Sequence, residues 1–188
     1  SRKERFEFLR PVFKRTSVEE AVKQLLPAEV VGFSLYVWNE QISLEIIRQL
    51  KKKTPKVYII CGGPQVPDRA ESFLRKNPGI DIAVHGEGER TFFELLKIFP
   101  SRKINQIPGT SKIIESGAFY SNPKADRTKD LSTFPSPYLS GVFDNLISIP
   151  DEEWLVLWET NRGCPFQCTF CDWGSAVADR IFRFDMER

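Results

Sequence analysis

The stretch Lys56-Val57-Tyr58-Ile59-Ile60-Cys61-Gly62-Gly63-Pro64 decides the fold that the sequence predicts. Its apolar residues follow one another without alternation, which is typical of a parallel strand that is buried on both faces of a sheet. Two glycines and a proline then end the run. Similar apolar runs occupy residues 30–35 and 80–84. The sequence therefore predicts three strands of one buried, mostly parallel sheet.

Helical patterns alternate with these strands. Ser17-Val18-Glu19-Glu20 is a capping box, in which a serine and a glutamate satisfy backbone N–H groups at the start of a helix. Further apolar stripes at helical spacing begin near Glu40, near Pro67 and after Glu89, and Asn39 is a candidate cap for the first of these helices. This alternation predicts an α/β, doubly wound, parallel-sheet domain of the Rossmann-like type over residues 1–100.

The carboxyl ends of the three predicted strands carry candidate binding residues. Ligands of such sheets bind beyond these ends, and glycine lets a backbone approach a bulky planar ligand closely. The candidates are Ser34, Tyr36, Gly62, Gly63, Gly86 and Glu87. The alternative is that the glycines only form strand-to-helix turns and that the glutamate only favours a helix N-terminus. The single histidine, His85, is predicted to be a satisfied polar residue at a strand end.

Residues 101–150 are richer in Pro, Ser and Asn, and are predicted to form a linker with local structure. Residues 111–114 and 118–120 flank a Glu-Ser-Gly turn, which predicts a hairpin that either pairs at the sheet edge or stands alone. Residues 154–160 are predicted to form a further strand that leads into a group of cysteines.

Three of the four cysteines, Cys164, Cys168 and Cys171, lie within eight residues. Thiolates this close cannot easily form disulfides of good geometry, but a short loop can fold them around a soft metal centre. Structural zinc normally takes four side chains, so three thiolates favour an incompletely ligated centre with one open position. A zinc site completed by Cys61, His85 or an acid remains an alternative. A thioredoxin-like Cys-x-x-Cys pair would leave Cys164 unexplained.

The spacing Cys-x3-Cys-x2-Cys, with Phe170 directly before the last cysteine, resembles the signature of the radical S-adenosylmethionine (SAM) enzymes. The resemblance implies that Cys164, Cys168 and Cys171 bind three irons of a [4Fe-4S] cluster, and that SAM chelates the fourth iron. It also implies that the reduced cluster cleaves SAM to a 5'-deoxyadenosyl radical, with Phe170 beside the adenine. Arg162-Gly163-Cys164-Pro165 and Cys171-Asp172-Trp173-Gly174-Ser175 resemble the members that carry an N-terminal cobalamin-binding-type domain.

The strand ends resemble that cobalamin-binding domain as well. The resemblance implies that the slot for the nucleotide tail of cobalamin is lined by Ser34, Tyr36, Gly62 and Gly63, with Gly86 and Glu87 next to it. The Asp-x-His-x-x-Gly motif, which supplies a lower cobalt ligand in some cobalamin proteins, is absent. Three interpretations stay open: the motif precedes Ser1, cobalamin binds with no histidine below cobalt, or the domain has lost cobalamin.

Residues 151–188 are predicted to begin a radical SAM partial (β/α) barrel, and the chain is predicted to be an inactive fragment of a longer enzyme. The resemblance implies a methyltransferase or rearrangement enzyme that acts on a small-molecule substrate with an electron donor. Methylcobalamin, when used, supplies the methyl group in that family. Two alternatives remain, namely a non-catalytic cobalamin-binding protein and a zinc-stabilised interaction module.

The composition limits the partners. The 188 residues carry a formal net charge of +2 from 27 basic and 25 acidic residues, so no broad electropositive field for nucleic acid is expected. No apolar run approaches the roughly 20 residues that cross a bilayer. A small number of clustered cysteines suits a reducing compartment, where thiolates remain available to iron. We therefore expect a cytoplasmic protein with no nucleic-acid or membrane partner.

Overall fold

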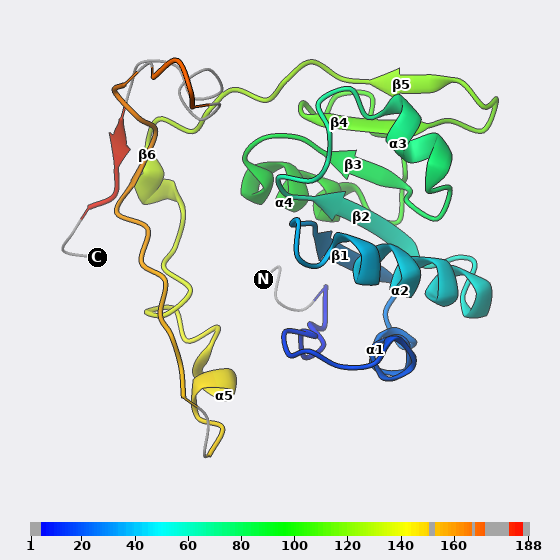
Figure 1. Ribbon diagram of the computed structural model, residues 1–188, viewed down its shortest axis with the longest axis horizontal. Coiled ribbons are helices and arrows are strands. Elements are labelled where there is room, and N and C mark those ends of the chain that lie inside the picture. The colour runs from blue at the N-terminus through cyan, green and yellow to red at the C-terminus, as the bar shows by residue number, and fades with distance from the viewer. Residues whose placement is uncertain (1–4, 151–152, 167, 172–180, 186–188) are drawn as a thin grey trace. The chain divides into compact units, whose positions relative to one another are not determined.

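A computed structural model describes residues 5–150, 153–166, 168–171 and 181–185 of the chain. The chain divides into two compact units, one that ends at Asp126 (unit 1) and one that begins at Arg127 (unit 2). Unit 1 contains the main sheet (Figure 1). Unit 2 contains the three clustered cysteines. Residues 172–175, which contributed to the resemblance, lie outside the described residues.

Unit 1 is built on a five-stranded sheet with the order β1-β2-β3-β4-β5 (Figure 1). The strands are β1 (Val30–Ser34), β2 (Tyr58–Gly62), β3 (Ile82–Val84), β4 (Thr110–Ile113) and β5 (Phe119–Ser121). β1, β2 and β3 are parallel, which confirms the three predicted strands. β4 and β5 form the predicted hairpin, and β4 pairs antiparallel with β3. The sheet therefore continues past residue 100 and includes the hairpin.

Helices cover both faces of this sheet. They are α1 (Val18–Leu25), α2 (Glu40–Lys53), α3 (Glu71–Lys76) and α4 (Gly88–Ile98). On one face, Ile47 of α2 and Leu74 of α3 join a buried cluster with Ile59 of β2. On the other face, Leu95 of α4 packs in a cluster with Ile60. Because successive residues of β2 point to opposite clusters, the sheet is buried on both faces, and the predicted Rossmann-like α/β fold is confirmed.

The predicted helix starts agree with the structure at α1 but not at α3. At α1, the Ser17 hydroxyl accepts a hydrogen bond of 3.1 Å from the Glu20 N–H, as the capping box predicts. α3 begins at Glu71, later than the predicted start near Pro67. The chain before it contains a turn closed by a 3.0 Å bond from the Val66 N–H to the Gly63 carbonyl, and residues 67–70 are not helical. Within the described residues, no helix has both the length and the apolarity that crossing a bilayer requires.

An ionic network occupies the amino edge of the parallel strands. Asp81 Oδ2 accepts hydrogen bonds of 2.7 Å from Lys51 Nζ and from the Ile59 N–H. The second carboxylate oxygen of Asp81 accepts one of 3.3 Å from Arg102 Nη1. The Arg102 guanidinium also lies over the Tyr58 ring, 4.8 Å from its centroid. These side chains bind one another, which leaves the opposite, carboxyl edge of the strands for a ligand.

Unit 2 contains only short elements in its described residues. They are a 3-10 helix, η2 (Leu131–Thr133), then α5 (Asp144–Ile147), and the antiparallel pair β6 (Asn161–Arg162) and β7 (Phe182–Arg183). The prediction of a strand over residues 154–160 is wrong, since residues 153–160 form no strand. Backbone pairing in this part of the chain begins at Thr160, whose carbonyl accepts a 3.1 Å bond from the Phe184 N–H next to the β6–β7 pair. Leu155 is 86% exposed and Leu157 is 77% exposed, whereas a barrel strand is paired and buried. The described residues therefore do not show the start of a barrel.

Candidate functional site

The carboxyl ends of the parallel strands lie side by side. Ser34, the last residue of β1, is in register with Gly62, the last residue of β2, and β3 ends at Val84 next to β2. The loops that leave these ends carry all the binding residues predicted in unit 1, namely Ser34, Tyr36, Gly62, Gly63, Gly86 and Glu87. The structure thus brings the predicted residues to one edge of the sheet, on three neighbouring loops.

Gly63 is required by the fold itself. The Leu35 N–H donates a hydrogen bond of 2.7 Å to the Gly62 carbonyl, and the Gln65 N–H donates one of 3.1 Å to the Leu35 carbonyl. This interlocking brings the Leu35 backbone so close that a Cβ at residue 63 would lie 2.6 Å from the Leu35 oxygen. Gly63 also has φ of +100°, a conformation that side chains disfavour. The turn interpretation therefore explains Gly63 without a ligand.

For Gly62, no contact with the described residues requires a glycine. A Cβ built on Gly62 would lie 3.7 Å from the Val84 Cβ, which is ordinary contact. Gly86 is explained by its φ of +72°, but a Cβ there would meet no atom within 4 Å, so its outer side is open. An unexplained glycine beside open backbone fits the close approach of a bulky ligand to this edge. The residues present therefore fit a large planar cofactor.

Asn39 organises the loop after β1, a role that the sequence did not predict. Its Oδ1 accepts a hydrogen bond of 2.8 Å from the Tyr36 N–H, and its Nδ2 donates one of 3.0 Å to the Ser34 carbonyl. The predicted capping bond from this side chain to α2 is absent among the described residues. The loop presents the rings of Tyr36 and Trp38 stacked at 4.7 Å with 10° between their planes, and Trp38 is 76% exposed. The carboxyl edge thus carries a stacked pair of aromatic rings, of which Trp38 is exposed.

His85 follows β3 and is held on two sides. Its backbone N–H donates a hydrogen bond of 2.8 Å to the Gly109 carbonyl, and its Nε2 lies 2.8 Å from the Ser111 hydroxyl. Burial lowers the pKa of His85 below its ordinary value of 6.5, so the imidazole is neutral at pH 7. The other ring nitrogen, Nδ1, is buried and has no hydrogen-bond partner among the described residues. Neither nitrogen is therefore presented to a ligand.

Cys61 is equally unsuited to bind a metal. It is buried in β2, and burial raises the pKa of its thiol to about 12, with a smaller contribution from the negative charge of Asp81. Since metals bind the thiolate, a thiol that stays protonated at neutral pH is a poor ligand. Cys61 and His85, two of the candidates for a fourth zinc ligand, are therefore both poorly suited to that role.

The three clustered cysteines of unit 2 are free thiols on a tight loop. Cys168 is exposed, Cys164 and Cys171 are half-buried, and the Cys171 N–H donates a 3.1 Å bond to the Cys168 carbonyl. Phe170 is 91% exposed. Across the described part of the chain, no three His, Cys, Asp or Glu side chains are gathered closely enough to hold a metal ion. The three-cysteine ligand set remains a prediction from the sequence.

Arg162 anchors the chain directly before this loop. Its guanidinium bonds to the Glu159 carboxylate, with Nη2 3.0 Å from Oε2. It also lies over the rings of Phe134 and Phe184, 5.1 Å and 5.7 Å from their centroids. Arg162 therefore stabilises the strand that leads to Gly163 and Cys164 through a salt bridge and two aromatic contacts.

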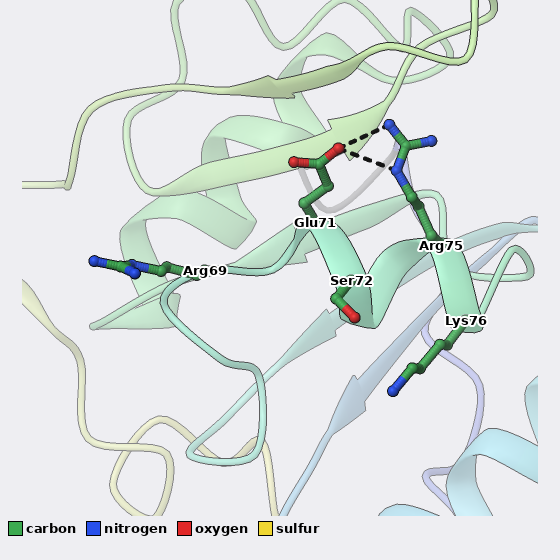
Figure 2. A pocket seen from close by; sticks show the side chains of 5 residues that line it. All are labelled: Arg69, Glu71, Ser72, Arg75 and Lys76. Atoms are coloured by element: carbon green, nitrogen blue, oxygen red, sulfur yellow. Dashed lines mark hydrogen bonds and ion pairs between the residues drawn. The ribbon is translucent and has the colours of Figure 1, made fainter.

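A shallow pocket lies beside α3 and carries none of the predicted residues. Figure 2 shows its lining, formed by Arg69, Glu71, Ser72, Arg75 and Lys76. Arg75 bonds to the Glu71 carboxylate at 2.8 Å, whereas the side chains of Arg69 and Lys76 point away from that pair (Figure 2). Its charged groups do not converge on one point, so the carboxyl edge is the better candidate site.

Residues 7–96 match the family described as B12 binding domain. This span contains β1, β2, β3 and the loops that carry the predicted binding residues. The chain carries a B12-binding domain. The carboxyl edge described above is therefore the edge of a B12-binding domain, and Asn39, Trp38 and His85 belong to it as well.

Two relatives match almost the whole chain, including residues beyond the B12-binding domain. Over 97% of its length, the chain is 39% identical to the cobalamin-dependent radical SAM methyltransferase TokK of Streptomyces tokunonensis. It is 38% identical, over the same share, to the 2-(S-pantetheinyl)-carbapenam-3-carboxylate methyltransferase of Streptantibioticus cattleyicolor. The chain spans 28% of the length of each of these relatives.

The solved structures agree on the fold. The cobalamin-dependent SAM radical enzyme OxsB with aqua-cobalamin bound superposes with a TM-score of 0.63 at 23% identity, over 83% of this chain and 22% of that one. The radical SAM methyltransferase TsrM from Kitasatospora setae, with tryptophan and a SAM analogue bound, gives 0.59 at 16% identity, over 90% of this chain and 35% of that one. The B12-binding domain therefore has the fold found in cobalamin-dependent radical SAM enzymes.

Proposed function

We propose that this chain is the corrinoid-binding part, with the beginning of the radical SAM part, of a cobalamin-dependent radical SAM methyltransferase. One observation carries the proposal. The 39% identity to TokK extends over 97% of the chain, so it includes both the B12-binding domain and most of the segment around the cysteine loop. If only the fold of the B12-binding domain were shared, the segment around the cysteine loop would not be expected to match TokK as well.

In this proposal, cobalamin binds at the carboxyl edge of β1, β2 and β3. The Ser34 hydroxyl and the glycine backbone at Gly62 and Gly86 would hold the nucleotide tail. The stacked Tyr36 and Trp38 would form a wall of the site and exclude water. Cobalamin, when bound, supplies a methyl group carried on cobalt. Because Nε2 of the single histidine is bonded and its Nδ1 is buried, we propose that no histidine of this chain lies below cobalt.

Cys164, Cys168 and Cys171 would hold a [4Fe-4S] cluster as thiolates, and SAM would complete it. The cluster, when bound, supplies the electron that cleaves SAM. Arg162 would keep the chain before Cys164 in place, and the exposed Phe170 would lie beside the adenine of SAM. The whole protein would then methylate a carbon of a small-molecule substrate, with a separate electron donor, in the cytoplasm. A non-catalytic corrinoid carrier is the second candidate, because the match to the B12 binding domain covers residues 7–96 and does not include the three cysteines.

Anaerobic turnover of the full-length protein tests this function. With reconstituted cluster, SAM and dithionite, we expect formation of 5'-deoxyadenosine, and formation of S-adenosylhomocysteine only when hydroxocobalamin is present. S-adenosylhomocysteine marks methyl transfer from SAM, which a carrier does not perform. Tight corrinoid binding without either product would support the carrier instead. A protein that binds neither iron nor corrinoid, but holds one zinc ion, would contradict both candidates.

A further inference from the structure

His85 lies where the loop between β3 and α4 meets the β4–β5 hairpin. It directly precedes Gly86 and Glu87, and it is tied to the hairpin by its backbone bond to Gly109 and by the 2.8 Å contact of Nε2 with the Ser111 hydroxyl. Ser111 lies on β4 and is completely buried. His85 is therefore held by two contacts, one to Ser111 of β4 and one to Gly109, which directly precedes β4.

The contacts of Gly109 tighten this arrangement. Its N–H donates a hydrogen bond of 2.7 Å to the Pro123 carbonyl, so the chain after β5 lies against the same point. A Cβ at residue 109 would lie 3.0 Å from the His85 carbonyl oxygen and 3.2 Å from the Ala125 Cβ. With so little space between these segments, the backbone at His85 cannot shift without moving the chain at Gly109 and Ala125.

The charges around His85 keep its ring neutral. Burial has the largest effect and lowers the pKa of His85, the positive charge of Lys124 also lowers this pKa, and the negative charge of Asp68 raises it. Asp68 and Lys124 come from the loop after β2 and from the chain after β5, and they form an exposed ion pair of 2.8 Å. Protonation would add a charge and a second N–H at the buried Nδ1, which has no partner among the described residues.

We propose that His85 is a positioning residue for the corrinoid-binding edge, because its bonds to Ser111 and Gly109 hold Gly86 and Glu87 in the arrangement that the cofactor meets. The part of this inference that concerns corrinoid affinity rests on the proposed function. The part that concerns the order of the loop does not.

Three variants of the full-length protein test the inference. His85→Leu removes the bond to Ser111, and His85→Gln keeps an amide that can reach the hydroxyl but cannot titrate. Thr110→Val is the matched control. Thr110 is the neighbouring residue of β4, is also completely buried, and bonds to the Ile107 carbonyl and to Asn122 at 2.7 Å and 2.9 Å. Its side chain points to the other face of the sheet, since neighbours on a strand alternate.

The first readout is affinity for hydroxocobalamin at pH 7.5, followed by absorbance. His85→Leu should weaken binding about tenfold, the effect of losing one buried hydrogen bond, whereas His85→Gln and Thr110→Val should stay within about threefold of wild type. Equal losses in His85→Leu and Thr110→Val would overturn the inference, because they would show general destabilisation. Unchanged affinity in His85→Leu would overturn it as well.

The second readout is pH. Because the folded state disfavours the protonated ring, wild-type stability should be full above pH 6.5 and decrease as the pH falls below that value, and corrinoid affinity should decrease with it. His85→Gln should lose this part of the pH dependence. A profile that is identical in wild type and His85→Gln would contradict a role for the ring.

The third readout needs no cofactor. Amide hydrogen exchange over residues 84–89 should become faster in His85→Leu but not in Thr110→Val. If wild-type protein failed to bind hydroxocobalamin, the proposed function would be wrong, and this exchange experiment would still decide the positioning role. Slow, unchanged exchange in His85→Leu would overturn it.

Discussion

Full-length protein in which Cys164, Cys168 and Cys171 are all replaced with alanine should contain no [4Fe-4S] cluster and should form no 5'-deoxyadenosine. Three thiolates would bind three of the four irons and leave one open to SAM, so their removal leaves the cluster without these protein ligands. The measurement is iron content together with the electron paramagnetic resonance signal of the reduced protein after anaerobic reconstitution. We expect complete loss of both rather than a partial decrease.

Cys61→Ala provides the matched control for this experiment. Cys61 is the fourth cysteine, but it is buried in β2 with a raised pKa, so it should not bind iron. The Cys61→Ala protein should keep its cluster, with at most a modest decrease in thermal stability from the small cavity. A cluster signal that persists in the triple variant, or that disappears in Cys61→Ala, would show that the ligand set is wrong.

Gly63→Ala and Gly62→Ala should differ sharply although the two glycines are neighbours. A methyl group at residue 63 would lie 2.6 Å from the Leu35 oxygen at a positive φ, so we expect Gly63→Ala to lower the free energy of unfolding by about 2–5 kcal/mol. At residue 62 the same group meets Val84 at ordinary contact distances, 3.7 Å from its Cβ and 3.9 Å from its carbonyl oxygen, so stability should stay within about 1 kcal/mol of wild type. Thermal or urea denaturation of the full-length variants measures this difference.

Corrinoid binding should separate the two variants in a second way. Gly62→Ala keeps the fold but places a methyl group where the cofactor is proposed to approach the backbone, so its affinity for hydroxocobalamin should fall at least about tenfold. Stable Gly62→Ala protein with wild-type affinity would remove Gly62 from the site. Gly63→Ala with unchanged stability would contradict the interlocking of the loops after β1 and β2.

The fold could be predicted where a local pattern determines burial. The uninterrupted apolar runs gave β1, β2 and β3 because a strand covered on both faces needs apolar residues at every position, as Ile59 and Ile60 show by packing in opposite clusters. The same kind of apolar pattern led to the wrong prediction of a strand over residues 154–160. An apolar run forms a strand only when another strand pairs with it, and pairing depends on segments far away in the sequence.

The candidate site could be predicted only in part. Its location followed from topology, because the carboxyl ends of parallel strands share an edge. The roles of individual residues did not follow. Gly62 and Gly63 were indistinguishable in sequence, and only the approach of Leu35 separates them. Asn39 was interpreted as a helix cap, and Ser111, which is 26 residues from His85, gave no signal at all. Such roles depend on long-range contacts that a single sequence does not show.

The structure of the full-length protein with bound hydroxocobalamin tests the central claim most directly. We expect the corrinoid to contact the chain at Ser34, Gly62 and Gly86, with His85 still bonded to Ser111 and not bound to cobalt. A corrinoid bound away from the carboxyl ends of β1, β2 and β3, or coordinated by His85, would contradict the account.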